Sequence, residues 1–332
     1  GGIGLVRNIV VRATGSGAGD PPDASPAVSA RSSVQALFRL VKAITQAGYD
    51  QRDLDWWLVT SGGMDAGDGR PVDPPSSALH GFMGSVLREY PHWAGRLIDI
   101  THGEKADWPV LLSVQPDPEV RTLARRDGRS LLQELVPVRT NDADEVPYRR
   151  GGVYVVIGGA GGIGEAWTRR MIERYDARIV WIGRRAMTAG IQSRIDALGA
   201  SGSAPVYIQV DAGDAEALAT ALATVRQSHG KIDGVVHSAI VLADASVARM
   251  AEVDLDRVLA AKVDTAVATA DVFADDDLDF VLFFSSLMSF GRSAGQGNYA
   301  AACQFADSFA SAMARRMSCP VKVMNWGWWG SV

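Results

Sequence analysis

The second half of the chain alternates short apolar runs with longer segments in which hydrophobic residues recur at helical spacing. The apolar runs, which predict buried strands, are residues 153–157, 178–182, 206–210, 234–237, 280–285 and 321–325. The helical segments between them are residues 163–174, 215–229, 251–273 and 300–316. Strands that alternate with crossover helices form a parallel sheet. The pattern therefore predicts an α/β fold with a doubly wound, parallel Rossmann-type sheet.

The first half shows the same alternation in a weaker form. Helical and apolar segments follow one another at residues 32–47, 54–60, 76–90 and 96–100. Ser76 is a candidate cap for the second of the two helices. Gly1-Gly2-Ile3-Gly4 resembles a dinucleotide-binding turn, but no strand precedes it, so we interpret the match as accidental. Because it has no complete phosphate-binding turn and no visible catalytic set, this half predicts a degenerate Rossmann-like structural subdomain.

The composition changes at two points that suit loops or linkers. Residues 15–30 are rich in Gly, Ala, Ser, Pro and Asp, and predict a loop or a poorly ordered insertion. Residues 140–152 are polar and contain a proline and two glycines, which suits a domain boundary. We therefore predict a structural subdomain at residues 1–145 and a catalytic subdomain at residues 146–332. The chain begins without Met and stops abruptly after Trp329-Gly330-Ser331-Val332, so we expect a segment of a longer polypeptide.

The bulk composition bears on several function classes. Hydrophobic residues make up 47% and charged residues 21% of the 332 residues, as in an ordinary soluble globular protein. The net charge of −5 implies no general attraction to nucleic acid. No apolar run reaches the roughly 18–20 residues needed to cross a bilayer. Cys303 and Cys319 are too few for a disulfide framework, and the five histidines show no metal-ligand spacing. No signal peptide is visible, so we expect a cytoplasmic protein without a metal or a membrane partner.

A glycine-rich turn follows the first strand of the second half and opens its first helix. Its sequence is Gly158-Gly159-Ala160-Gly161-Gly162-Ile163-Gly164. Glycines let the backbone turn tightly and approach a pyrophosphate, whose charge is stabilised by the helix N-terminus. We predict that this turn binds a dinucleotide; the alternative is a flexible loop.

Two arginines at the end of the second strand indicate which dinucleotide is bound. An acidic residue there would favour NAD by binding the ribose hydroxyl. Arg184 and Arg185 instead suit a 2′-phosphate, through charge-assisted hydrogen bonds, and favour NADPH. The alternative is a solvated basic turn. Asp211, after the third strand, suits a hydrogen bond from the adenine amine, and it suits equally well a cap for the helix that begins near Asp214.

Three residues have the chemistry that reduction of a ketone requires. Tyr299 can donate a proton to the carbonyl oxygen, although an unperturbed phenol has a pKa of about 10. Lys262, on a predicted helix, would supply a nearby ammonium that lowers this pKa. Ser286, at the carboxyl end of a predicted strand, would orient the carbonyl and stabilise its developing charge. Each residue also has a structural interpretation: an exposed helix lysine, a turn serine or a packed core tyrosine.

Together with several landmark sequences, these residues resemble a ketoreductase domain of a modular polyketide synthase, in the short-chain dehydrogenase/reductase superfamily. The landmarks are residues 155–164, His237-Ser238-Ala239, Phe283-Phe284-Ser285-Ser286, Gly295-Gln296-Gly297-Asn298-Tyr299-Ala300-Ala301-Ala302 and Asn325-Trp326-Gly327. The resemblance covers nearly everything after residue 35, and such domains also begin with a structural subdomain. Three sequences are most similar to synthases whose acyltransferase acts in trans: His237-Ser238-Ala239-Ile240, the Tyr-Ala-Ala-Ala-Cys run that begins at Tyr299, and the Gly-Trp-Trp-Gly-Ser-Val ending.

The resemblance implies a function and a role for each residue. The function is NADPH-dependent reduction of a β-ketoacyl thioester carried by an acyl carrier protein, beside other polyketide synthase domains. Tyr299 would be the acid, and Lys262 would lower its pKa and contact the nicotinamide ribose. Ser286 would bind the carbonyl oxygen, and Ser238 and Ala239 would contact the cofactor.

The resemblance also favours one configuration of the product. Leu242-Ala243-Asp244 keeps the second acid of the Leu-Asp-Asp sequence common in B-type domains, which make D-configured hydroxyls. Gly291 stands where domains of the opposite type carry a tryptophan, and Ala301 favours a substrate that is unbranched or not epimerised. Leu287 and Gln296 are expected to act with Asp244 on the substrate and its stereochemistry.

Two positions depart from the family pattern. Cys303 stands four residues after Tyr299, where a short-chain dehydrogenase usually has its lysine and this family an asparagine. We interpret it as a small packed residue. Ile157 replaces a common threonine. These departures leave open a non-reducing scaffold or docking domain. A freestanding short-chain dehydrogenase acting on a free ketone is the second alternative.

Overall fold

The computed structural model describes residues 6–13, 24–138 and 146–329. By its internal contacts the chain divides into two compact units. The first comprises Gly1–Val136, Leu242–Ala260 and Leu287–Ala312, and the second comprises Pro137–Val241, Ala261–Ser286 and Met313–Val332. The glycine-rich start, part of the predicted loop at 15–30 and residues 140–145 of the predicted boundary lie outside the described residues.

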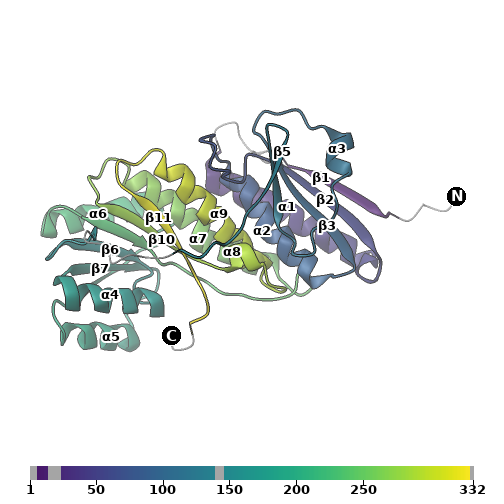
Figure 1. Cartoon of the computed structure of the whole chain (residues 1–332). Coiled ribbons are helices and arrows are strands. Elements are labelled where there is room, and N and C mark those ends of the chain that lie inside the picture. The colour runs from purple at the N-terminus through teal and green to yellow at the C-terminus, as the bar shows by residue number, and fades with distance from the viewer. Residues whose placement is uncertain (1–5, 14–23, 139–145, 330–332) are drawn as a thin grey trace. The chain divides into compact units, whose positions relative to one another are not determined.

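The first unit contains a five-stranded sheet in the order β1-β2-β3-β4-β5 (Figure 1). Its strands are β1 (Asn8–Arg12), β2 (Leu54–Ser61), β3 (Trp93–Ile100), β4 (Thr122–Arg126) and β5 (Arg129–Leu132). The first four are parallel, and β5 returns antiparallel to β4. The predicted strands at 54–60 and 96–100 are β2 and β3. The sequence did not reveal β1, β4 and β5, which carry arginines and are not continuous apolar runs.

The two helices predicted in the first unit, at residues 32–47 and 76–90, both begin earlier than predicted, at Pro26 and Pro74. The helices of this unit are α1 (Pro26–Gln46), η1 (Tyr49–Gln51), α2 (Pro74–Glu89), α3 (Trp108–Leu112) and α8 (Met288–Gly291). The Ser25 side chain caps α1, and Pro26 takes the first helical position, so the loop predicted up to residue 30 is wrong from Pro26 onward. Asp73, not Ser76, caps α2, by accepting from the Ser76 amide at 3.2 Å.

The second unit contains the predicted doubly wound sheet. Its strands are β6 (Val153–Ile157), β7 (Arg178–Gly183), β8 (Val206–Gln209), β9 (Gly234–His237), β10 (Phe280–Ser286) and β11 (Val321–Trp326). They are all parallel, in the order β11-β10-β9-β6-β7-β8. Its helices are α4 (Gly162–Tyr175), α5 (Ala189–Gly199) and α6 (Ala215–His229), while α7 (Glu252–Val272) and α9 (Gly297–Ala314) run from one unit into the other. The predicted fold class is confirmed, and α5 is a helix that the sequence reading missed.

The two sheets lie on either side of the boundary predicted between residues 145 and 146. The division by contacts differs, because it assigns residues 242–260 and 287–312 to the unit of the first sheet. The subdomain boundary therefore stays a prediction.

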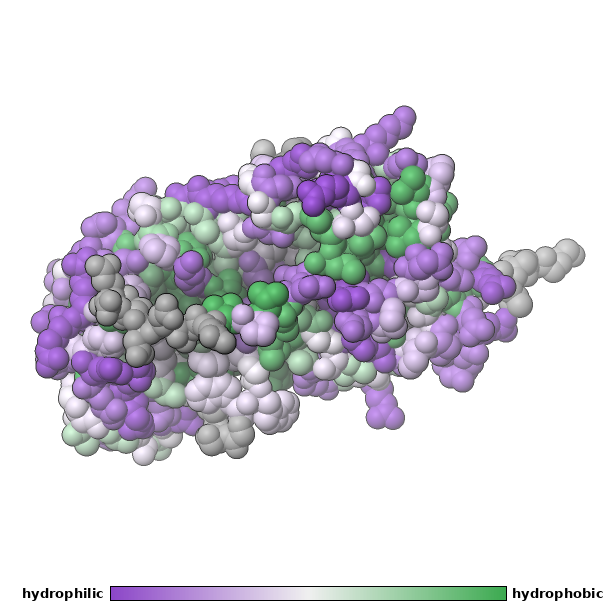
Figure 2. All heavy atoms as spheres, in the orientation of Figure 1, coloured by the Kyte–Doolittle hydropathy of each residue, from purple (hydrophilic) through white to green (hydrophobic). Residues whose placement is uncertain are grey.

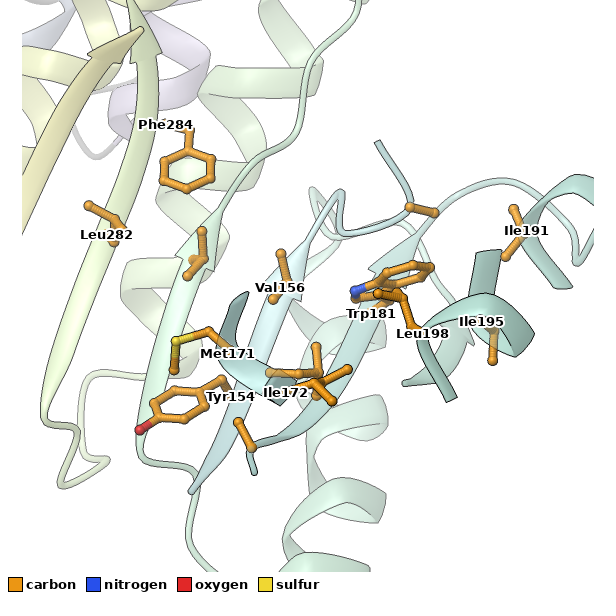
Figure 3. Packing of buried hydrophobic residues seen from close by; sticks show 14 of the residues in the cluster. Tyr154, Val156, Met171, Ile172, Trp181, Ile191, Ile195, Leu198, Leu282 and Phe284 are labelled. Atoms are coloured by element: carbon orange, nitrogen blue, oxygen red, sulfur yellow. The ribbon is translucent and has the colours of Figure 1, made fainter. Parts of the chain in front are cut away.

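One apolar cluster holds α4 and α5 against the sheet of the second unit (Figure 3). Trp181 of β7 is fully buried, and its indole N–H donates to the Thr168 hydroxyl of α4 at 2.9 Å. Met171 of α4 and Ile195 of α5 belong to the same cluster. Buried apolar side chains of this size each contribute roughly 1.5–3 kcal/mol, so the cluster fixes the helices that frame the glycine-rich turn.

Hydrophilic residues cover much of the face seen in Figure 2, and hydrophobic residues reach that surface in limited patches. Across the described parts of the chain, no helix combines the length and apolar character needed to span a membrane.

Candidate active site

The glycine-rich turn joins β6 to α4 and is held by backbone hydrogen bonds to β7 and within the turn. Gly158 donates to the Ile182 carbonyl of β7 at 2.7 Å, and Gly161 donates to the Gly158 carbonyl at 2.9 Å. Gly158 has a φ of +80°, which L side chains rarely adopt. A Cβ atom there would lie 2.7 Å from the carbonyl oxygen of Ser238, just beyond β9. Position 158 therefore requires glycine both for its conformation and for lack of space.

The N-terminus of α4 has the features of an anion-binding site. Thr188 and Asp214 cap α5 and α6 with their side chains, whereas Gly161, the N-cap of α4, has no side chain to offer. The first N–H groups of α4 can therefore bind a ligand, and the helix dipole favours negative charge there. The turn also lies where the strand order reverses between β6 and β9, which is where sheets of this kind bind ligands. These features fit the pyrophosphate of a dinucleotide.

Basic side chains lie beside this turn. Arg184 and Arg185 follow β7 and are both exposed, and the Arg185 guanidinium reaches the Ala160 carbonyl of the turn at 3.5 Å. Arg194 of α5 donates to the same carbonyl at 3.1 Å and pairs with Glu165 of α4 at 3.1 Å. Sequence reasoning missed Arg194 because the segment that carries it was not recognised as a helix.

Asp211 does not cap the helix that follows it. Its carboxylate accepts from the Gly213 amide at 3.0 Å, and the cap of α6 is Asp214, which accepts from the Ala217 amide at 3.0 Å. The capping interpretation of Asp211 is therefore wrong, and its contact with adenine stays a prediction.

Lys262 is buried in the second unit. It lies on α7 with 3% of its surface exposed, so the interpretation as an exposed helix lysine is wrong. Its ammonium donates to the Phe284 carbonyl of β10 at 2.8 Å and reaches the Ala239 carbonyl, after β9, at 3.4 Å. Carbonyl dipoles reduce the cost of burying the charge. Because the strands are parallel, the ammonium lies at the same edge of the sheet as the glycine-rich turn.

Ser286 is the last residue of β10 and is 9% exposed. It pairs in register with Trp326 of β11, and its backbone carbonyl accepts from the Asn325 side chain at 3.2 Å. Ser286 therefore stands at an anchored strand end, as predicted, and not in a turn.

His237, at the end of β9, is a neighbour of Lys262 that the sequence did not single out for a role. It is fully buried and stacks on Phe283 with ring centroids 5.3 Å apart. Burial, with a further contribution from the Lys262 charge, lowers the pKa of His237 from 6.5 to about 3. The imidazole is therefore neutral at physiological pH, and the buried ammonium has an uncharged neighbour here.

Tyr299 lies in the first unit, in the first turn of α9, and is 8% exposed. The side chain of Asn298 accepts from the Tyr299 amide at 2.8 Å and donates to the Ala243 carbonyl at 2.8 Å. The start of α9 is thus attached to the segment that carries Asp244. Cys303, further along α9, is fully buried, as expected of a packed residue.

The predicted stereocontrol residues also lie in the first unit. Gln296 donates to the Asp244 carboxylate at 2.7 Å, so these two side chains are in direct contact. Leu287 and Gly291 line a cavity of about 580 Å³, and neither Asp244 nor Gln296 is among its lining residues. Ala301 is fully buried on α9.

Comparison with known proteins identifies the family. The family profile described as KR domain matches residues 152–331. The chain belongs to the KR domain family. KR domains are nicotinamide-dependent reductases of the short-chain dehydrogenase type, and the resemblance found in the sequence is confirmed.

The KR domain is similar to segments of very long proteins. Polyketide synthases PksN and PksM of Bacillus subtilis are 47% and 45% identical to it, over 296 and 297 residues. The matches cover 89% of this chain but only 5% and 7% of those synthases. A subunit of the phenolphthiocerol/phthiocerol polyketide synthase of Mycobacterium tuberculosis is 30% identical over 328 residues.

Solved structures share the fold of this KR domain. A ketoreductase domain from the bacillaene assembly line superimposes with a TM-score of 0.82 at 20% identity, covering 100% of this chain and 83% of that one. An A-type ketoreductase from a modular polyketide synthase superimposes with a TM-score of 0.76 at 29% identity, covering 90% and 63%.

The predicted site residues of the KR domain form two sets. Lys262 and Ser286 belong to the second unit with the glycine-rich turn, Ser238 and Ala239. The first unit holds Tyr299, Asp244, Gln296 and Leu287. Among the described residues, no group of three or more His, Cys, Asp and Glu is arranged to hold a metal ion. The catalytic and binding roles of both sets stay predictions.

Proposed function

We propose that this KR domain reduces the β-keto group of an acyl thioester on an acyl carrier protein, with NADPH as the reductant and a D-configured hydroxyl as the product. The observation that carries the proposal is the buried Lys262 ammonium at the carboxyl edge of the sheet, beside the turn that suits a dinucleotide. Burying a charge is costly, and a purely structural lysine would gain more from solvent.

Tyr299, Lys262 and Ser286 each have one role in the reduction of the ketone. NADPH, when bound, supplies the hydride that reaches the carbonyl carbon. Tyr299 donates its phenolic proton to the carbonyl oxygen, so the ketone gains one hydride and one proton and becomes an alcohol. The Lys262 ammonium stabilises the phenolate until solvent returns a proton, and Ser286 donates a hydrogen bond to the carbonyl oxygen.

The choice of NADPH over NADH is supported by the positive charge beside the turn. Arg184 and Arg185 follow β7, and Arg194 adds a third guanidinium within reach of the Ala160 carbonyl. Guanidinium groups suit the 2′-phosphate that distinguishes the two cofactors.

The D configuration is supported by Asp244, which is held by Gln296 at 2.7 Å. Gly291, at the position of the tryptophan of the opposite type, agrees with it.

Reduction on a carrier protein is supported by the synthases to which this chain is similar. Tethering gives the substrate a high local concentration, so the domain needs no tight grip on the acyl chain. PksN is a synthase of the trans-acyltransferase kind. This chain is 47% identical to PksN and 30% identical to the mycobacterial subunit, which agrees with an origin in a synthase of that kind.

A pair of neighbouring serines provides the test of this proposal. The substrate is a β-ketoacyl thioester, and NADPH consumption is measured for wild type, Ser286→Ala and Ser285→Ala. Ser285 is buried beside Ser286, and no hydrogen-bond partner of its hydroxyl is found among the described residues. Loss of one donor to a developing oxyanion costs roughly 10²–10³ in kcat, so Ser286→Ala should show that loss and Ser285→Ala should not.

The same assay separates the alternatives. Turnover of a free ketone that far exceeds turnover of the thioester would favour a freestanding dehydrogenase. Tight NADPH binding without turnover of either substrate would favour a scaffold or docking domain.

A further inference from the structure

Two loops of the first unit are joined along their length. The first, residues 243–247, carries Asp244; the second, residues 293–296, carries Gln296 and leads into α9. The Ala245 amide donates to the Gly295 carbonyl at 2.9 Å, in addition to the contact between Asp244 and Gln296. Gly295 has a φ of +79°, which favours glycine at this contact. The relative position of Asp244 and Gln296 thus depends on how the two loops are held.

A single carboxylate from outside the loops binds both of them. Glu89 is the last residue of α2, and one of its oxygens accepts from the Val247 amide at 2.7 Å. Its other oxygen accepts from the Gly295 amide at 3.1 Å. Glu89 therefore binds one residue of each loop. Both hydrogen bonds are charge-assisted and stronger than hydrogen bonds between neutral groups.

Helix α2 also supports the second loop one turn earlier. The Ser85 hydroxyl donates to the Ser293 carbonyl at 2.6 Å, and Ser85 and Glu89 lie on one helix face because they are four residues apart. A Cβ atom on Gly84 would collide with the Arg292 side chain. The last turns of α2 therefore pack against the start of the 293–296 loop.

We infer that Glu89 is a positioning residue for stereochemical control, which holds Asp244 and Gln296 in the relation that selects one face of the carbonyl. The inference rests on the proposed function, because it assigns stereocontrol to this pair. Glu89 itself is not placed in contact with substrate. It acts by fixing the 243–247 and 293–296 loops against each other.

The test uses Glu89→Gln, which keeps the size of the side chain but leaves one acceptor oxygen for two amide donors. Glu252→Gln is the matched control, because Glu252 is also in the first unit and pairs only with the surface residue Arg39 in the contacts described. The measurements are the enantiomer ratio of the alcohol, kcat and KM with a β-ketoacyl thioester, and urea unfolding. We expect the minor enantiomer to increase at least about fivefold in Glu89→Gln and to stay constant in Glu252→Gln.

A second variant and a double variant keep the inference open to refutation. Glu89→Asp retains the charge but shortens the reach, so its ratio should lie between those of wild type and Glu89→Gln. Gln296→Ala combined with Glu89→Gln should change the ratio by less than the sum of the single effects, because both act on one contact. An unchanged ratio in both Glu89 variants, with lower stability or kcat, would make Glu89 merely structural and overturn the inference. The proposed function fails separately, if wild type shows no turnover, and a shift in the ratio is readable whichever enantiomer wild type prefers.

Discussion

Replacing Gly158 with alanine measures how closely the glycine-rich turn approaches the neighbouring strand. Two costs add at this position. The left-handed φ of +80° costs an L residue about 1–2 kcal/mol. The new methyl group would lie 2.7 Å from the Ser238 carbonyl oxygen and 2.9 Å from the Ala239 Cα, and overpacking of this kind costs about 1–3 kcal/mol. We expect Gly158→Ala to lower the free energy of unfolding by about 2–5 kcal/mol.

Gly151→Ala isolates the first of these costs. Gly151 has a φ of +71°, but a Cβ atom there would meet nothing within 4 Å. Its loss of stability should therefore be about 1–2 kcal/mol. Urea unfolding followed by far-UV circular dichroism measures both losses, and titration with NADPH measures the effect on the turn. Gly158→Ala should weaken NADPH binding at least about tenfold, equivalent to about 1.4 kcal/mol, while Gly151→Ala should bind as wild type does.

The comparison has a clear refutation. Equal stability losses in the two variants would mean that Ser238 and Ala239 do not crowd position 158, and that glycine is needed there only for its φ. Unchanged NADPH affinity in Gly158→Ala would mean that the turn is not the cofactor site.

Three further predictions concern buried or charged side chains. Burial lowers the pKa of His80 and of His237 to about 3, so below pH 6.5 the unfolded chain binds protons that the folded chain does not. The free energy of unfolding should therefore decrease as the pH is lowered, by about 2 kcal/mol per histidine between pH 7.5 and pH 5. In His237→Gln, the difference in this free energy between the two pH values should be about 2 kcal/mol smaller than in wild type. Asp99→Ala should lower the free energy of unfolding by about 3–5 kcal/mol in urea, because it removes the buried carboxylate that pairs with a buried arginine. Arg184→Ala combined with Arg185→Ala should raise the Kd of NADPH by about 10–100-fold and leave that of NADH unchanged, by fluorescence titration.

The second sheet could be predicted because its strands are buried on both faces. All residues of β6 and β10 are buried, and such strands are near-continuous apolar runs that stand out from the helices around them. The glycine-rich turn was predictable for a related reason, since it must follow a strand and open a helix. Strands β4 and β5 gave no such signal, because both contain arginines and β5 is largely exposed.

Helix α5 was missed although its sequence held a signal. Ile191, Ile195 and Leu198 recur at helical spacing and are buried, and Thr188 caps the helix. The remaining residues of α5 are polar or small, so the apolar stripe is narrow. Arg194 was missed for the same reason, because its contact with the glycine-rich turn depends on that helix.

The two hydrogen bonds of the Glu89 carboxylate could not be predicted from the sequence for a different reason. Its bonds to Val247 and Gly295 join residues 158 and 206 positions apart in the chain. A glutamate at the end of a helix has no local pattern that indicates such partners. The neutral state of His237 is similar, because it results from burial and from the Lys262 charge and not from neighbouring residues in sequence.

Tyr299 is proposed as the acid of a stereospecific ketone reduction, and comparing wild type with Tyr299→Phe tests this role. NADPH consumption with a β-ketoacyl thioester is measured for wild type and Tyr299→Phe, and the alcohol is analysed on a chiral column. We expect that wild type makes the D-alcohol and that Tyr299→Phe, which loses only the hydroxyl, is inactive but binds NADPH. Turnover by Tyr299→Phe at the wild-type rate would contradict this role of Tyr299, and an L-alcohol from wild type would contradict the proposed D configuration.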